Sequence, residues 1–506
     1  MQIERCKPLI LGILSGSLLL IAFRYLPILG FIFYIPLLWV IRNRPLRDVC
    51  ISTGVAAIIF NAIYYGWLYF ADVGHAKGWL IVGVTLLIIY LSIPWVLVGV
   101  GAKILPMWMT PFLWVGLEFL RSLTSEIGFA WGLVGYALVP YLKMVQVADI
   151  VGIYGISFIV MLVNLLLYYL LFLRRRWMII PIITLFVCIY LYGVKKMALQ
   201  YWPKLKVAII QPNIEPYVKR LPLSERIDKL KNMCHNLNVD LIVWPETAFP
   251  FILDTNSVFY HEIVEFVDSI NTPLIFGATR LDNGKVYNSA ILLVPNNGMD
   301  HYDKIYLVPF AERLPFDEYF PVLQRIFRFG QGNFAKGKEF KVFHLDGYNI
   351  AVLICFESIF PRLVRRFVLN GANLLVNITE DAWFGRSWGP YQHATMPIMR
   401  AIEFRIPVIR CANTGISMYV LPNGEVPYES KLFTEAVIVA NVPIREEETF
   451  YARYGDVLPI GSIIFTLGMT LIHLYRHRRK KLSFNCNSCS VKSTILRRFI
   501  KPQTFK

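Results

Sequence analysis

Charged residues are scarce in this chain, and acidic residues are scarcer than basic ones. Only 17% of the 506 residues are charged and 56% are hydrophobic, with 34 Asp and Glu against 51 Lys and Arg. Soluble domains carry about a quarter charged residues, so this composition indicates a membrane protein. The basic residues flank apolar runs and fill a block at the C-terminus, which favours membrane topology over a nucleic-acid surface.

Regularly spaced cysteines and glycine-rich phosphate loops are also missing. The eight cysteines are scattered along the chain, so no disulfide framework is implied. Cys486 and Cys489 form one CxxC pair, but a zinc site needs four ligands and no second pair lies nearby. We therefore do not expect a metal site at this pair.

Long apolar runs fill the N-terminal part of the chain. A single helix over 8–41 would be about 51 Å long, against a hydrocarbon core of about 30 Å, so two short spans that turn at Arg24 are expected. Arg5 and Lys7 resemble the start of a signal peptide, but no A-x-A-like cleavage site follows, which favours a retained anchor. The eight expected spans cover residues 8–23, 25–41, 51–71, 79–101, 105–120, 150–173, 177–193 and 458–475.

The positive charges around these spans predict their orientation. Arg5, Lys7, Arg42 and the "RHRRKK" segment at 476–481 fall on one side if both termini are cytoplasmic. Eight spans then leave two segments outside, the loop at 121–149 and the polar block at 194–457.

The outer loop at 121–149 is rich in aromatic residues and glycine. Its composition fits an interfacial aromatic belt and fits equally well a lid at the membrane surface. Both interpretations stay open at this point.

The polar block contains short β-rich runs such as "KVAIIQ", "DLIVWP" and "ANLLVNI", which alternate with helix-like stretches. This alternation predicts a layered α/β domain. The expected fold is therefore a polytopic helical membrane bundle with an α/β domain inserted before its last helix. The expected parts are a seven-span bundle at 1–202, a catalytic domain at 203–445, a membrane helix at 446–480 and a basic cytoplasmic tail at 481–506.

Three chemically capable side chains follow expected strands. Glu246 comes after "LIVW", Lys304 after "HYD" and Cys355 after "AVLI". A nucleophilic cysteine needs a base, and acyl transfer through it needs a positive group to stabilise the oxyanion. Taken singly, each has a plainer explanation: a lone strand cysteine is usually a buried core residue, and a charge after a strand is usually solvated.

Together these segments resemble the carbon–nitrogen hydrolase (nitrilase) superfamily. The resemblance implies an α-β-β-α sandwich in which Glu246 is the general base, Lys304 the triad lysine and Cys355 the nucleophile. It also implies supporting roles for Glu312 and Glu357. The segments that carry it are "WPET" (244–247), "DKIYLVPFAE" (303–312), "ICFE" (354–357), "DAWFG" (381–385), "GPYQH" (389–393) and "NTGIS" (413–417).

The arrangement of spans around this domain is similar to that of the apolipoprotein N-acyltransferases. That likeness implies transfer of an acyl chain from a phospholipid, typically phosphatidylethanolamine, to the α-amine of an S-diacylglyceryl cysteine at the N-terminus of an apolipoprotein. A thioester on Cys355 would be the intermediate. The implied partners are the two lipid substrates and the membrane, with no cofactor and no nucleic acid. The implied location is the bacterial inner membrane, with the catalytic domain in the periplasm.

The chain departs from that family at a few positions. Phe356 stands where the family usually has Tyr, so a hydroxyl is missing while an aromatic ring remains. Ala311 replaces a usual Gly. Glu380 replaces the usual Asn before "DAWFG", and we expect it to add negative charge at the rim of the site.

Two other functions compete with acyl transfer between lipids. A membrane-tethered amidase of the nitrilase type would share the acyl-enzyme and use water as the acceptor, but it would have no use for a membrane bundle. A transporter with an outer binding domain would be expected to carry more ionisable residues within its spans, where Glu118 is the main exception.

Overall fold

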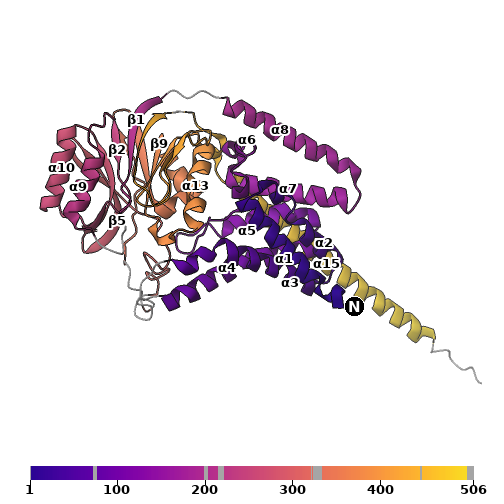
Figure 1. Cartoon of the computed structure of the whole chain (residues 1–506). Helices are drawn as coiled ribbons and strands as arrows, with labels where there is room; N and C mark the ends of the chain where they lie inside the picture. Colours follow the sequence, from indigo (N-terminus) through magenta and orange to yellow (C-terminus); the bar gives the residue numbers. More distant parts are fainter. Residues whose placement is uncertain are drawn as a thin grey trace, which may run out of the picture.

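A computed structural model shows a helical bundle joined to an α/β domain (Figure 1). The described backbone covers residues 2–71, 77–198, 203–214, 221–320, 322, 333–444 and 447–498, with side chains from residue 6 to residue 479 within these ranges except at 203 and 204.

Apolar helices form the bundle. Six described helices are long and apolar enough to cross a membrane, and two further apolar segments, Pro27–Asn43 and Met107–Leu120, are shorter. The predicted fold class is confirmed, with eight as an approximate number of spans. The helices are α1 (Gln2–Arg24), α2 (Ile35–Asn43), α3 (Leu46–Tyr64), α4 (Lys77–Ile104), α5 (Thr110–Leu120), α6 (Leu142–Val145), α7 (Ala148–Leu171), α8 (Ile179–Met197) and α15 (Val457–Arg498).

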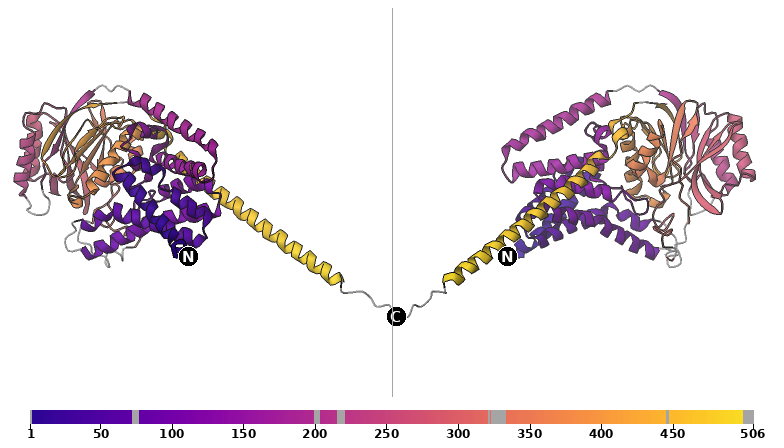
Figure 2. Two further views of the ribbon diagram at one scale, coloured as in Figure 1. Left: turned by 45° about the vertical axis from the view of Figure 1, so that its right-hand side comes forward. Right: turned by 180° about the vertical axis from the view of Figure 1, so that it is seen from behind.

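The last helix, α15, is much longer than the span expected near its start. Its 42 residues correspond to about 63 Å, roughly twice the hydrocarbon thickness. Figure 2 shows α15 running past the other helices as a single rod. Cys486 and Cys489 lie in its distal part, outside the described side chains.

Two β-sheets form the centre of the α/β domain. The first has seven strands in the order β13-β1-β2-β4-β5-β6 with β3 beside β4, and the second has six in the order β12-β11-β10-β9-β8-β7. The first sheet contains β1 (Pro203–Gln211), β2 (Leu241–Val243), β3 (Phe249–Ile252), β4 (Leu274–Asp282), β5 (Lys285–Val294), β6 (Gly298–Asp303) and β13 (Ala436–Pro443). The second contains β7 (Phe343–Leu345), β8 (Tyr348–Ile354), β9 (Leu374–Thr379), β10 (Val408–Ala412), β11 (Met418–Val420) and β12 (Tyr428–Glu429).

Both faces of the central strands β1 and β2 are buried, which explains their continuous apolar runs. Successive side chains point to opposite faces. Ile209 and Val243 pack toward the second sheet, whereas Ile210 and Ile242 pack under the outer helices. Those helices are α9 (Leu223–Met233) and α10 (Val258–Ile270), which makes the domain an α-β-β-α sandwich.

The opposite outer layer connects the sandwich to the membrane bundle. It consists of α12 (Pro361–Leu369) and α13 (Gly389–Phe404), and α13 lies between the second sheet and the bundle (Figure 1). One apolar cluster runs without interruption from the bundle through this layer to the space between the sheets. The two parts are therefore packed as one body.

The loop at 121–149 fills part of this junction. Trp131 and Tyr136 are each only 3% exposed, which is contrary to an exposed aromatic belt. The buried carboxyl group of Glu118 accepts a hydrogen bond from the backbone N–H of Val134 (2.9 Å) and so ties the loop to the end of α5. Of the two interpretations left open by composition, the structure favours a cover.

Gly277 on β4 allows the backbone of Glu246 to pack directly against that strand. A Cβ at this position would lie 1.9 Å from the carbonyl oxygen of Glu246. We expect Gly277→Ala to displace this segment and lower the free energy of unfolding by about 1–3 kcal/mol, as overpacking usually does. Thermal unfolding of the purified protein measures the effect. Gly461→Ala on α15, where nothing lies within 4 Å, is the matched control, and equal stability of the two variants would contradict the prediction.

Candidate functional site

Glu246 lies just past the end of β2, with its side chain 9% exposed. Its Oε1 accepts a hydrogen bond from Asn288 Nδ2 (2.8 Å), and its Oε2 accepts one from the backbone N–H of Glu380 (2.9 Å). Burial raises the pKa of Glu246, and the neighbouring charge of Glu312 adds to this while Lys304 opposes it. A carboxylate with a raised pKa is a stronger base, which suits proton abstraction near neutral pH.

Lys304 directly follows β6 and is almost fully buried, with its side chain 1% exposed. Its Nζ lies 2.9 Å from Glu312 Oε1 and 3.5 Å from Glu246 Oε1. Burial alone would lower the pKa of Lys304, but the two carboxylates outweigh it and raise the pKa above its ordinary value. Lys304 is therefore a fixed positive charge at neutral pH.

Cys355 directly follows β8 and turns the chain sharply. Its φ of 51° lies in the left-handed region, which is uncommon for a residue other than glycine and often marks a functional site. Burial and then the charge of Glu246 raise the pKa of the Cys355 thiol, with Lys304 opposing them. The sulfur therefore rests as a thiol and becomes a nucleophile only when a base removes its proton.

Glu357 holds the ends of the two sheets together and is fully buried. Its Oε1 accepts hydrogen bonds from Tyr302 Oη (2.7 Å) and from the backbone N–H groups of Ile305 (2.8 Å) and Tyr306 (3.1 Å). Its Oε2 accepts one from the backbone N–H of Ile354 (2.9 Å). Glu357 therefore fixes the segment that carries Lys304 relative to the strand that carries Cys355.

Phe356 packs as an aromatic ring and is 7% exposed. Its ring centroid lies 5.1 Å from that of Phe360 and 6.2 Å from that of Phe129 in the loop at 121–149. The packing role expected for this ring is present, and it links the residue after Cys355 to the loop.

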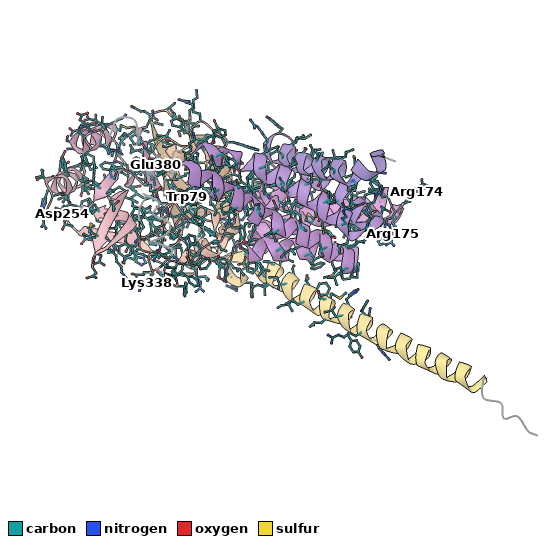
Figure 3. The ribbon with its side chains drawn as sticks, turned by 90° about the horizontal axis from the view of Figure 1, so that it is seen from below. Trp79, Arg174, Arg175, Asp254, Lys338 and Glu380 are labelled. Carbon is teal, nitrogen blue, oxygen red and sulfur yellow. The ribbon has the colours of Figure 1, made fainter. Side chains whose placement is uncertain are left out.

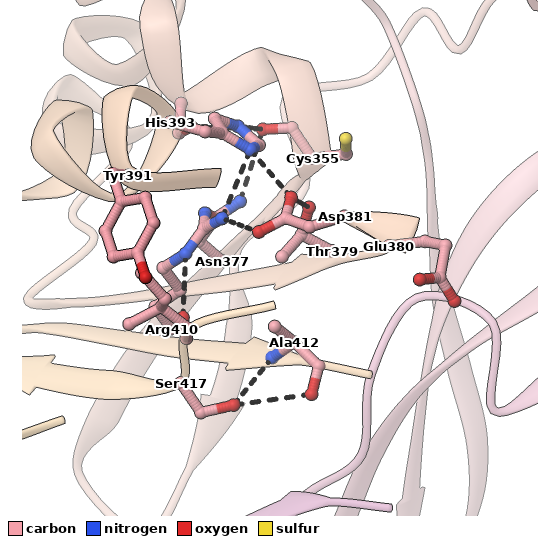
Figure 4. Close-up of polar contacts among 12 residues, drawn as sticks. Cys355, Asn377, Thr379, Glu380, Asp381, Tyr391, His393, Arg410, Ala412 and Ser417 are labelled. Atoms are coloured by element: carbon pink, nitrogen blue, oxygen red, sulfur yellow. Dashed lines mark hydrogen bonds and ion pairs between the residues drawn. The ribbon is translucent and has the colours of Figure 1, made fainter. Parts of the chain in front are cut away.

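Behind Cys355 lies a polar network that the sequence did not single out (Figure 4). Asp381 contacts His393 Nδ1 (2.9 Å) through Oδ1 and Arg410 Nη2 (2.7 Å) through Oδ2, and all three side chains are fully buried. Burial alone would raise the pKa of Asp381, but Arg410 and His393 outweigh it and lower the pKa to about 2. The "DAWFG" and "GPYQH" segments contain two of these residues, but the pairing with Arg410 needs the folded sheet.

Glu380 is not at the rim of the site, contrary to expectation. It is 2% exposed, and its carboxylate accepts hydrogen bonds from Thr247 Oγ1 and Asn413 Nδ2, each 2.6 Å, and from the backbone N–H of Ala382 (2.9 Å). Burial raises its pKa to about 7. The extra charge is therefore held inside the protein between the two sheets, because polar partners from both sides enclose it.

No metal-binding group of three or more His, Cys, Asp or Glu side chains occurs within the described part of the chain. The structure brings Lys304 into direct contact with both Glu246 and Glu312. Cys355 lies close enough for the charges of Glu246 and Lys304 to shift the pKa of its thiol. An anionic base, a fixed cation and a thiol at one junction are the groups that acyl transfer through cysteine requires.

Comparisons with known proteins identify both parts of the chain. A family model for carbon–nitrogen hydrolases matches residues 206–450, and one for the apolipoprotein N-acyltransferase N-terminal domain matches residues 15–166. An amidase of known structure from Nesterenkonia sp. is 15% identical, covers 49% of this chain and 93% of its own, and has a TM-score of 0.37.

The globular part is thus a carbon–nitrogen hydrolase domain. An apolipoprotein N-acyltransferase of Geobacter metallireducens is 34% identical over 94% of this chain and 96% of its own. Another, from Chlorobaculum tepidum, is 33% identical over 69% of this chain and 73% of its own. The chain belongs to the apolipoprotein N-acyltransferase family and is an acyltransferase, which confirms the resemblance seen in its motifs.

The buried Glu380 predicts a pH-dependent stability. Its pKa of about 7 in the folded protein exceeds the value of about 4.3 in an unfolded chain. The contribution of Glu380 to the free energy of unfolding is therefore fully present below about pH 4 and is lost as the pH rises through about 7. Glu380→Asn removes this loss, so the melting temperature of the variant minus that of the wild type should increase between pH 5 and pH 8.

Thermal melts at matched pH values measure this difference. Glu435→Gln is the control, because the side chain of Glu435 is 57% exposed and screened by water. A difference for Glu380→Asn that stays constant with pH would show that the carboxyl group does not titrate in this range.

Proposed function

We propose that this protein transfers an acyl chain from a phospholipid of the phosphatidylethanolamine type to the α-amine of the N-terminal S-diacylglyceryl cysteine of an apolipoprotein. The observation that carries the proposal is the junction of Glu246, Lys304 and Cys355, seated directly on a membrane bundle. The assignment of these three residues as base, cation and nucleophile is part of the proposal.

The first half of the reaction forms the thioester. Glu246 takes the thiol proton as the sulfur of Cys355 attacks the ester carbonyl of the phospholipid. Lys304 stabilises the resulting oxyanion together with the backbone N–H of Phe356. The tetrahedral intermediate collapses, the lysophospholipid oxygen leaves with the proton from Glu246, and the acyl chain stays on sulfur.

The second half transfers the chain to nitrogen. The free α-amine of the lipopeptide attacks the thioester carbonyl and gives a proton to Glu246. The carbon–sulfur bond then breaks, and the thiolate recovers the proton from Glu246. Glu312 keeps Lys304 in place through its 2.9 Å contact, so the cation serves both oxyanions from one position.

The membrane bundle suits two lipid substrates. Removing acyl chains from a bilayer costs about 0.8 kcal/mol per CH₂ group, and a site seated at the surface avoids most of that cost. In Figure 3, Arg174 and Arg175 lie at the end of the bundle farthest from the α/β domain, and Glu380 lies within that domain. Cytoplasmic segments are rich in arginine, which supports an inner-membrane protein whose catalytic domain faces the periplasm.

One experiment tests the reaction. Purified full-length protein is incubated with phosphatidylethanolamine labelled in its acyl chains, and a hydroxylamine-sensitive label on Cys355 is the expected result. A diacylated lipopeptide with a free α-amine should then discharge it, and the same peptide with an acetylated amine should not. Cys355→Ala should carry no label, whereas Cys6→Ala, which removes an exposed cysteine, should be labelled like the wild type.

The alternative function gives a different result. A membrane-tethered amidase or lipase would form the adduct and lose it to water at the same rate with or without the lipopeptide. Absence of any adduct on the wild-type protein would exclude a thioester intermediate.

Transfer also requires that water stays away from the thioester. Trp383, Phe384 and Trp388 follow the strand end beside the site, and we propose that they shield it. Trp388 contacts the ring of Tyr64 (5.5 Å between centroids) and lies under the guanidinium of Arg24 (4.9 Å).

Trp388→Gln should therefore raise the ratio of phospholipid hydrolysis to acyl transfer. Both products are counted from the labelled phospholipid in the presence of the lipopeptide. Trp177→Gln alters a tryptophan that is 61% exposed beside Arg176, outside the α/β domain, and should leave the ratio unchanged. An unaltered ratio in Trp388→Gln would refute the shielding role.

A further inference from the structure

Two consecutive residues at the start of α13 face in different directions. Gln392 contacts the membrane bundle, and His393 contacts the backbone of Cys355. Both are buried, with exposures of 5% and 0%. Neither belongs to the set of base, cation and nucleophile, so their function is open.

The amide group of Gln392 is hydrogen-bonded to the bundle through both its oxygen and its nitrogen. Its Oε1 accepts hydrogen bonds from Trp131 Nε1 (2.9 Å) and Trp67 Nε1 (3.1 Å), and its Nε2 donates to the carbonyl oxygen of Tyr64 (3.0 Å). Three residues from two segments of the bundle, 64–67 and the loop at 121–149, therefore fix one side chain of the catalytic domain.

Trp131 extends this contact to the next residue. Its indole ring stacks on the imidazole of His393, with centroids 5.3 Å apart and planes inclined by 25°. Trp131 is itself held, because its carbonyl oxygen accepts hydrogen bonds from Tyr65 Oη (2.9 Å) and Arg121 Nη2 (3.0 Å). The orientation of the imidazole thus depends on a residue of the bundle loop.

On its other side, His393 helps to hold the carbonyl oxygen of Cys355. That oxygen accepts hydrogen bonds from Ser358 Oγ (3.0 Å) and Asn377 Nδ2 (3.4 Å), and His393 Nε2 lies 3.2 Å from it, where it donates a hydrogen bond when Nε2 carries a proton. Figure 4 shows this oxygen pointing toward His393 and the sulfur pointing away from it.

Because the peptide bond is planar, a contact that fixes the carbonyl oxygen of Cys355 also fixes the N–H group of Phe356. In a trans peptide, the carbonyl of residue 355 and the N–H of residue 356 point in opposite directions. Donors that fix the oxygen from behind therefore fix the direction of the Phe356 N–H, which the proposed reaction uses for the oxyanion. The unusual φ of Cys355 makes outside support necessary, because strained conformations persist only when their surroundings hold them.

We propose that Trp131, Gln392 and His393 form a positioning link through which the membrane bundle sets the oxyanion-binding N–H of Phe356. The link rests on the proposed function, since it acts on the acylation of Cys355. His393 is a positioning residue and has no contact with the reacting atoms. The link makes acylation by a lipid dependent on how the bundle and its loop are packed.

The test compares two reactions of the same sulfur in purified full-length protein. Acylation by labelled phosphatidylethanolamine passes through an oxyanion, whereas alkylation by iodoacetamide does not. His393→Leu should slow the maximal rate of acylation by roughly 100-fold, the size expected for a small misplacement of a catalytic group, with KM for the phospholipid unchanged. Alkylation of Cys355 should proceed at the wild-type rate.

Two further variants test the parts of the link. His393→Gln keeps an N–H donor near the position of Nε2 and should recover much of the acylation rate. Trp131→Phe keeps an aromatic ring on His393 but removes the donor to Gln392, and should slow acylation by about 5-fold, as for one lost hydrogen bond. Trp95→Phe, another buried tryptophan of the bundle that is 4% exposed, is the matched control and should behave like the wild type.

Other outcomes overturn the link. Equal losses of acylation and alkylation in His393→Leu would show that His393 only supports the fold, and unchanged acylation would show that it does not position the N–H. If Trp131→Phe acylates at the wild-type rate, the bundle does not help to position the Phe356 N–H through Trp131. A wild-type protein that alkylates but never acylates would instead refute the proposed function itself.

Discussion

A buried ammonium group between two carboxylates is the constraint on which this structure depends. Lys304 has almost no contact with water, and Glu246 and Glu312 compensate for the hydration that it loses. Removal of Lys304 from such a cluster leaves two buried carboxylates without a cation, which is far more costly than loss of a surface ion pair. The strand ends that carry Glu246 and Lys304 must therefore lie within a few ångströms of each other. Glu357 ties the segment that carries Lys304 to the end of β8, before Cys355, through four hydrogen bonds.

The continuous packing of the bundle and sandwich follows from the same requirement. A charge cluster keeps its geometry only when the surrounding side chains cannot rearrange, and a close-packed interior provides that rigidity. Here the apolar cluster between the sheets continues through α13 into the membrane helices. The bundle therefore serves as a structural wall of the catalytic domain as well as an anchor in lipid.

Much of this arrangement could be predicted from the sequence. Apolar runs gave the membrane helices, and short β-rich runs gave the strands whose ends carry Glu246, Lys304 and Cys355. What local patterns could not predict was any contact between distant segments. Trp131 and Gln392 are 261 positions apart, and nothing in either segment identifies the other. Glu380 was expected at the rim for the same reason, since its partners Thr247 and Asn413 come from separate strand ends.

The resting state of Cys355 has a consequence for redox chemistry. Thiolates are the form that oxidants and disulfides attack, and burial keeps this sulfur protonated until a base and a substrate are both in place. With the domain in the periplasm, as proposed, Cys355 would face an environment that promotes disulfide formation. The raised pKa of the thiol would then protect Cys355 from oxidation between turnovers. The same burial that delays deprotonation until substrate is bound would also preserve the nucleophile.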